Sequence, residues 1–210
     1  MKRSKTSGAW MREHVNDFYV KSAKKHDFRS RAAFKLLEIN ERDRLLSPGM
    51  IVVDLGAAPG SWSQVTAKKV GARGKVIALD ILQMQPIAGV DFICGDFRED
   101  AVLKELRSKL GGKAADLVIC DISPNISGVA SHDQARVMEL AQLALEFSAQ
   151  ALKPQGRLLV KTFHGEGFEE FLKAMRSRFK QVVSRKPKAS RGRSSEIYLL
   201  GKGLKQHGQG

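Results

Sequence analysis

Acidic residues close three of the apolar runs that the sequence predicts as buried strands. Asp80, Asp96 and Asp121 end the runs KVIALD, VDFICGD and DLVICD. A carboxylate can accept two hydrogen bonds, so Asp80 could hold both ribose hydroxyls and Asp96 an adenine amine, with the Phe97 ring packed on the base. A single acid in such a place is more often a turn or cap residue. Three at successive strand ends indicate a nucleoside site.

A glycine loop, DLGAAPGSW at 54–62, follows an earlier predicted strand, MIVVDL at 50–55. Gly56 and Gly60 let the backbone turn tightly and approach a ligand. The loop matches neither GxGxxG nor GxxxxGK[ST], which argues against a dinucleotide fingerprint and against a phosphate-binding P-loop. A nucleoside without phosphates therefore fits the loop better, and Asp80, 20 residues past Gly60, stands where an acid can reach its ribose.

Strands and helices alternate along the chain, which predicts an α/β fold with a mostly parallel, seven-stranded sheet and helices on both faces. The predicted strands are 50–55, 75–80, 90–96, 116–121 and 156–163, with 181–184 and 196–201 as a terminal antiparallel pair. The predicted helices are 30–43, 61–70, 98–110, one that ends before Pro154, and 167–178. In such sheets the ligand lies beyond the carboxyl ends of the strands, where the acids stand.

Composition narrows the class of protein. The chain has 210 residues, a formal net charge of +14 and 42% apolar residues. No apolar stretch approaches the roughly 18 residues that span a bilayer, and the start has no secretory pattern, so we expect a cytoplasmic protein and no membrane partner. Cys94 and Cys120 lie in apolar runs and are predicted to be buried strand thiols. No histidine stands at metal-ligand spacing, so we expect no metal site.

The excess charge lies at the two ends of the chain. Residues 1–49 carry a net +6, residues 50–150 a net −2 and residues 151–210 a net +10. This distribution indicates a polyanionic partner, because displaced counterions favour the binding of phosphates. Nucleic acid is favoured over an anionic membrane, because no basic helix has a strongly apolar face.

We expect one domain with short extensions. Residues 1–10 are predicted to be a flexible basic arm and residues 202–210 a flexible tail. Residues 11–201 form the domain, of which 11–49 are a basic helical extension.

Five motifs occur in order along most of the chain: SRAAFKLLEI (30–39), VVDLGAAPGSWSQ (52–64), GDFR (95–98), SPNISG (123–128) and HGEGF (164–168). Together they resemble the FtsJ-type heat-shock methyltransferases, bacterial enzymes that methylate a uridine 2′-hydroxyl in 23S ribosomal RNA. The resemblance implies a Rossmann-like S-adenosylmethionine-dependent methyltransferase fold. It also implies S-adenosyl-L-methionine as cofactor, bound by Gly60, Trp62, Asp80, Asp96 and Asp121.

Two residues depart from the family pattern. Ser61 stands where the family has a second glycine, and because serine is small we expect cofactor binding to be retained. His164 stands where glutamine is commoner, three residues past Lys161.

The family carries a catalytic Lys-Asp-Lys-Glu tetrad, which corresponds here to Lys35, Asp121, Lys161 and Glu196. Our hypothesis is that Lys161 is the general base, because desolvation and the nearby Lys35 ammonium favour its neutral form. Asp121 would orient it, and Glu196 would hold Lys35 or the ribose. The simpler alternatives are a strand-end salt bridge for Lys161 and a helix-face pair of Lys35 with Glu38.

Ribosomal RNA of the large subunit is the partner that the resemblance implies, and we expect it to dock on the two basic ends. The candidate contacts are Arg12, Lys21, Lys24, Lys25, Arg29 and Arg31, and Arg191 and Arg193 in the basic stretch at 184–194. Aromatic residues lie among the first group and could stack on bases. We expect a monomer, because the basic surfaces would repel each other.

Three alternatives stay open at this point. The substrate could be another RNA, such as a transfer RNA or an mRNA cap. The chain could be an RNA-binding assembly factor without catalysis, although intact acids and an intact tetrad argue against it. An NAD-dependent oxidoreductase is disfavoured by the loop GAAPG.

Overall fold

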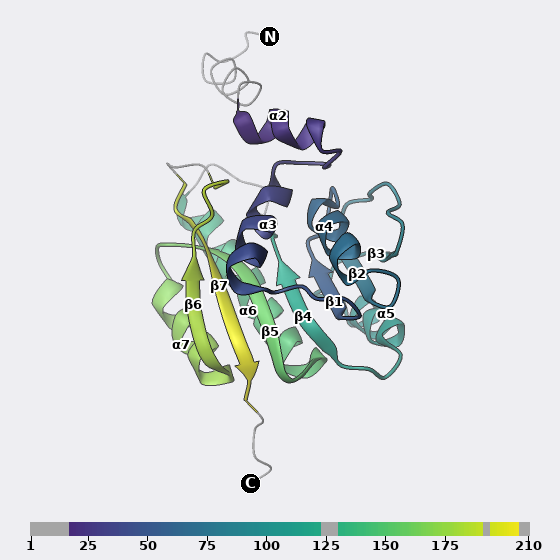
Figure 1. The fold of residues 1–210 in the computed structure, drawn as a ribbon. Helices are drawn as coiled ribbons and strands as arrows, with labels where there is room; N and C mark the ends of the chain where they lie inside the picture. The colour runs from purple at the N-terminus through teal and green to yellow at the C-terminus, as the bar shows by residue number, and fades with distance from the viewer. Residues whose placement is uncertain (1–16, 123–129, 191–193, 206–210) are drawn as a thin grey trace, which may run out of the picture.

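The computed structural model describes residues 17–122, 130–190 and 194–205. Its centre is a seven-stranded sheet with the strand order β3-β2-β1-β4-β5-β7-β6 (Figure 1). The strands are β1 (Ile51–Leu55), β2 (Lys75–Asp80), β3 (Val90–Cys94), β4 (Ala115–Cys120), β5 (Leu152–Phe163), β6 (Phe179–Arg185) and β7 (Glu196–Leu204). The first five are parallel, and β7 runs antiparallel between β5 and β6. The prediction of a mostly parallel α/β sheet is therefore confirmed.

Helices cover both faces of the sheet. They are α2 (Phe18–Lys25), α3 (Ala32–Asp43), α4 (Ser61–Val70), α5 (Asp100–Leu110), α6 (Ala130–Ala151) and α7 (Phe168–Arg178). One core cluster joins α3 and α4 to the face that includes Val52, and the other joins α5, α6 and α7 to the face that includes Val53. Successive strand residues point to opposite faces, so a strand buried on both sides is mostly apolar, as IVVDL shows at every position except Asp54.

Two helices, α2 and α3, lie in the described part of the basic extension. Asp17 caps α2 by accepting a hydrogen bond from the Tyr19 amide at 2.9 Å. In α3, Ala33, Leu36 and Ile39 are buried against the sheet. Helix α2 lies past the end of the sheet toward which β4 runs, and the chain leaves β7 at the opposite end (Figure 1). The extension therefore stands over the edge at which the predicted site lies.

Asp43 fastens the end of α3 to the last two strands. Its side chain is 3% exposed and lies 2.6 Å from Nε of Arg185 and 2.7 Å from Nζ of Lys202. The hydrogen bonds from Arg185 are the main reason that its pKa is lowered to about 2. This contact holds α3, which carries Lys35, against β6 and β7.

The start of β5, the end of β7 and the exposure of Cys94 differ from the predictions. β5 begins at Leu152, although α6 ends just before it at Ala151, because Leu152 already pairs with Ala115 across a register shift. β7 runs to Leu204, so the predicted tail begins too early at residue 202. Cys120 is buried, whereas Cys94 is exposed, because β3 is an edge strand.

Within the described ranges, no helix is both long and apolar enough to cross a bilayer.

Candidate active site

A cavity of about 520 Å³ opens at the carboxyl edge of the sheet. Its lining includes Gly56, Asp80, Asp96, Phe97 and Asp121, which follow four different strands. This volume lies within the range of small-molecule sites. The structure thus brings together the three strand-end acids and the first glycine of the loop.

Gly56 sits at a point where no side chain fits. Its φ is +72°, and a Cβ atom there would lie 2.1 Å from Cγ1 of Ile122, a residue that also lines the cavity. Its amide donates to the Leu79 carbonyl at 2.8 Å, which ties the turn to the end of β2. A glycine is therefore required for the loop to lie against the ends of β2 and β4.

Asp80 joins the loops that follow β1 and β2. Its two carboxylate oxygens accept hydrogen bonds from the amides of Ala58, at 2.9 Å, and Leu82, at 2.8 Å. Each carboxylate oxygen has a second lone pair, so the side chain can also accept from ligand hydroxyls.

Asp96 is held by the arginine two residues later. Arg98 Nε lies 3.0 and 2.9 Å from the two carboxylate oxygens, and these bonds lower the pKa of Asp96. The carboxylate therefore stays ionised and can accept from an amine. Phe97, beside it, is 6% exposed and lines the same cavity.

Gly60 and Trp62 lie outside the lining residues of this cavity. Trp62 is 2% exposed, donates from its indole nitrogen to the Ala32 carbonyl at 2.8 Å, and packs on the Tyr198 ring. Cofactor contact by these two residues stays a prediction. Ser61, the first departure from the family, is buried with its hydroxyl 2.7 Å from that of Ser30.

The tetrad forms two ion pairs. Lys161, which is 5% exposed, lies 3.2 Å from Asp121 Oδ1 and donates to the Asp121 carbonyl at 2.8 Å. Lys35 Nζ lies 2.8 Å from Glu196. Glu38 accepts instead from the Lys188 amide, so the helix-face pair with Lys35 is not formed.

Tyr198 links the two pairs and was not singled out from the sequence. Its hydroxyl donates to Asp121 Oδ1 at 2.7 Å, and Lys35 Nζ lies 5.8 Å from the centre of its ring. Burial is the main cause that raises its pKa well above 10, so the hydroxyl keeps its proton. The available signal was strand alternation, because Tyr198 lies two residues past Glu196 and so on the same face.

Asp54 lies beneath the glycine loop at the end of β1. It is fully buried and accepts a hydrogen bond from the Ser63 hydroxyl at 2.6 Å. Burial raises its pKa to about 7, against the effect of Ser63 and with smaller contributions from Asp121 and Asp80.

The second departure from the family, His164, is exposed beyond the end of β5. Its ring packs on that of Phe168 with centroids 4.6 Å apart, and its amide donates to the Ser195 carbonyl.

The predicted RNA contacts divide into two groups. Lys21, Lys24 and Lys25 are exposed on α2. The guanidinium groups of Arg29 and Arg31 are engaged within the protein, Arg31 with Asp17 and with the Ala189 carbonyl. Arg12, Arg191 and Arg193 lie outside the described residues.

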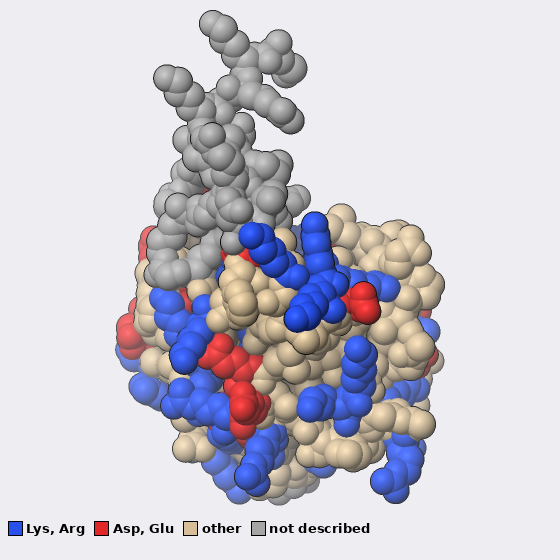
Figure 2. Space-filling view, turned by 45° about the horizontal axis from the view of Figure 1, so that its top comes forward, with Lys and Arg blue, Asp and Glu red and all other residues tan. Residues whose placement is uncertain are grey.

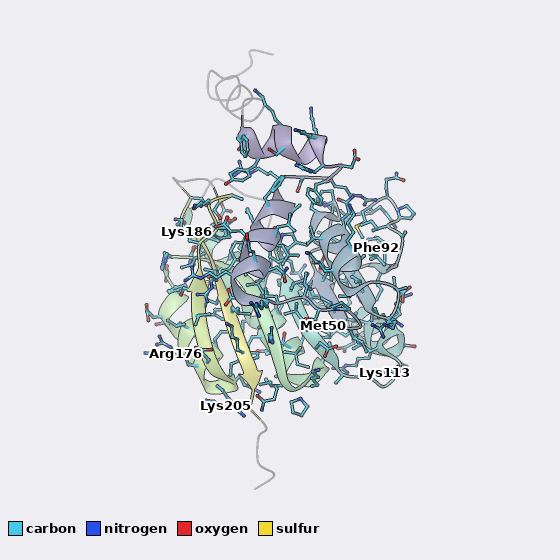
Figure 3. The ribbon with its side chains drawn as sticks, viewed as in Figure 1. Met50, Phe92, Lys113, Arg176, Lys186 and Lys205 are labelled. Carbon is cyan, nitrogen blue, oxygen red and sulfur yellow. The ribbon has the colours of Figure 1, made fainter. Side chains whose placement is uncertain are left out.

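Basic side chains occupy much of the face that Figure 2 shows, with a smaller group of acids among them. Lys186 lies toward the end of the molecule that carries α2, whereas Arg176 and Lys205 lie toward the other end (Figure 3). Across the described parts of the chain, no group of three or more His, Cys, Asp or Glu side chains is placed to hold a metal ion.

A mostly parallel sheet with a glycine turn, strand-end acids at one cavity and a buried lysine paired with one of those acids is typical of a Rossmann-like α/β fold with its ligand site at the carboxyl edge. Comparisons with known proteins give the family. The model of the FtsJ-like methyltransferases matches residues 28–204. The chain belongs to this family and is a methyltransferase.

The curated relatives match nearly the whole length of the chain. The chain is 64% identical over 203 residues to the ribosomal RNA large subunit methyltransferase E of Nitrosospira multiformis, covering 97% of this chain and 98% of the relative. It is 61% identical to the protein of the same name from Chromobacterium violaceum, covering 97% and 99%. A solved structure titled as a ribosomal RNA methyltransferase from Plasmodium falciparum is 30% identical, with a TM-score of 0.76, and covers 84% of this chain and 98% of that one.

Proposed function

We propose that the protein methylates the 2′-hydroxyl of a uridine in 23S ribosomal RNA of the large ribosomal subunit. The observation that carries this proposal is the buried Lys161, bonded to Asp121 beside the cavity. The names of the relatives support a large-subunit RNA substrate.

The cavity suits S-adenosyl-L-methionine. Asp80 would accept from the ribose hydroxyls, Asp96 from the adenine amine, and Phe97 would pack on the base. Gly56 lets the turn pack closely on Ile122, which also lines the cavity. Asp121 would lie near the sulfonium, and Gly60 and Trp62 would support the loop. The cofactor supplies a methyl group that the positive sulfur has already activated for transfer.

Lys161 would take the proton of the attacking hydroxyl. A ribose hydroxyl is a poor nucleophile until its proton is lost, so a base placed beside it raises the rate. The Asp121 carbonyl and carboxylate fix the direction in which Nζ points, since both lie within reach of it.

Lys35 and Glu196 would hold the ribose in place. Glu196 accepts from Lys35 Nζ and from the Ser190 hydroxyl at 2.7 Å, so its carboxylate is fixed by two partners. Lys35 comes from the extension and Glu196 from β7, so the pair joins two distant segments at the site. Such fixed alignment of the reacting groups supplies much of a transferase's rate.

The test is Lys161→Ala. Removal of a general base typically lowers the rate by about 10²–10⁴-fold, so single-turnover methyl transfer should slow by that factor while cofactor affinity is retained. Lys153→Ala is the matched control, because Lys153 lies at the other end of β5 and pairs with Asp116. Near-normal transfer by Lys161→Ala would rule out its role as the base.

The RNA would lie across α2 and the basic stretch before β7. Exposed Lys21, Lys24 and Lys25 are available to phosphates. We also propose Arg12, Arg191 and Arg193 as contacts, on the charge of their segments.

A further inference from the structure

The guanidinium of Arg29 donates hydrogen bonds to backbone carbonyls of two loops at the cavity. Its Nη1 donates to the carbonyls of Pro59, at 2.8 Å, and Gln85, at 2.7 Å. Its Nη2 donates to the Pro86 carbonyl at 2.9 Å. Pro59 belongs to the loop after β1, and Gln85 and Pro86 belong to the loop after β2.

Both loops form the wall of the proposed cofactor site. Ala58 lines the cavity from the first loop, and Ile81 and Leu82 line it from the second. Asp80 joins the loops on the cavity side, and Arg29 joins them further out. The two loops are therefore fixed to each other at two points.

The segment around Arg29 is itself fixed to the start of α4. The Arg29 amide donates to Gln64 Oε1 at 2.9 Å, and Gln64 Nε2 donates to the Asp27 carbonyl at 3.1 Å. The hydroxyls of Ser30 and Ser61 lie 2.7 Å apart. The backbone that carries the Arg29 side chain is therefore fixed in place beside the two loops.

Gly60 makes room for this contact. A Cβ atom at Gly60 would lie 2.9 Å from Arg29 Nη1 and 2.6 Å from Cδ1 of Ile87. This close approach gives a reason for a glycine at a position outside the cavity lining.

We propose that Arg29 is a positioning residue for the cofactor, which holds the loops 57–60 and 81–87 in the arrangement that binds it. The chemistry favours this role over a phosphate contact, because a planar guanidinium can donate to several carbonyls at once and three of its five N–H donors are already bonded to the two loops. The inference rests on the proposed cofactor site.

The test measures binding of S-adenosylmethionine by calorimetry, without RNA, for the full chain and its variants. Arg29→Ala should raise the Kd at least tenfold. Arg29→Lys should also raise it, because an ammonium is a point charge that cannot span both loops. Hydrogen exchange without cofactor should speed up at the amides of Ala58 and Leu82. Lys113→Ala, which removes the same charge from an exposed site at the opposite edge of the sheet, should leave this Kd unchanged.

Each outcome bears on the inference. A wild-type Kd in a folded Arg29→Ala variant would overturn it, and so would a fall in the salt dependence of RNA binding with cofactor affinity intact. If Arg29→Ala does not fold, a wild-type Kd in Arg29→Lys would overturn it equally. Failure of the wild-type protein to bind S-adenosylmethionine would instead refute the proposed function, and this inference with it.

Discussion

Burial is the main cause of the raised pKa of Asp54, a carboxyl group next to the glycine loop. Its pKa is raised from 3.8 to about 7, so between these values the folded protein holds a proton that the unfolded chain releases. When the native state binds more protons than the unfolded state, stability falls as pH rises. The contribution of Asp54 is therefore favourable below about pH 4 and is lost as pH approaches 7.

The variant Asp54→Asn should remove this dependence, because an amide accepts the Ser63 hydrogen bond without titrating. The free energy of unfolding of the variant, minus that of the wild type, should increase between pH 4 and pH 7. One pKa unit corresponds to about 1.4 kcal/mol, which sets the upper limit of the change per pH unit. Urea unfolding at several pH values measures it. A difference that does not vary with pH would contradict the assignment.

Single residues could be predicted from the sequence where position along a strand decides their role. Asp80, Asp96 and Asp121 all line the cavity, because parallel strands end at one edge. Strand alternation places Tyr198 on the face of Glu196, but its bond to Asp121 depends on which distant side chain it meets. The contact of Lys35 with Glu196 was expected from the family resemblance and not from position along a strand. Arg29 was predicted as an RNA contact from charge alone, and its carbonyl partners come from loops far along the chain.

The turn between β1 and α4 contributes Gly56 and Ala58 to the cavity of the proposed cofactor site. Gly56→Ala would place a methyl group against Ile122 and strain the backbone at φ +72°. We expect cofactor affinity to fall at least tenfold, as calorimetry would show. Gly71→Ala is the matched control, since Gly71 has φ +66° but nothing within 4 Å of its Cβ position. Equal cofactor affinities of the two variants would show that the contact with Ile122 is unimportant.

The helices and strands were predicted well where apolar residues recur at a regular spacing. Their first and last residues were predicted less well. The helix that precedes Pro154 ends at Ala151 as expected. The start of β5 was missed because Lys153, Pro154 and Gln155 look like a turn, although Leu152 already pairs with β4. The end of β7 was missed because GKGL has no strand pattern, yet its backbone pairs with β5 and β6.

Over the whole molecule, we interpret the charge of +14 as a surface for RNA. Reversal of Lys24 and Lys25 to glutamate should weaken RNA binding at all sequences. It should also lower the salt dependence of binding, by about one unit of slope for each phosphate that the variant no longer neutralises. Cofactor affinity should not change, because both side chains are exposed on α2.

We expect the same result from reversal of Arg191 and Arg193. Filter binding across a salt series measures the slope in both cases. An unchanged slope would remove the segment concerned from the docking surface.

The most direct test of the proposed activity is the position of the transferred methyl group. The purified protein would be incubated with S-adenosylmethionine labelled in its methyl group and with large-subunit ribosomal RNA, and the RNA digested to nucleosides. We predict label in 2′-O-methyluridine at a single position, and label that appears about 10²–10⁴-fold more slowly with the Lys161→Ala variant. Label on a base, or cofactor binding without any transfer, would contradict the account.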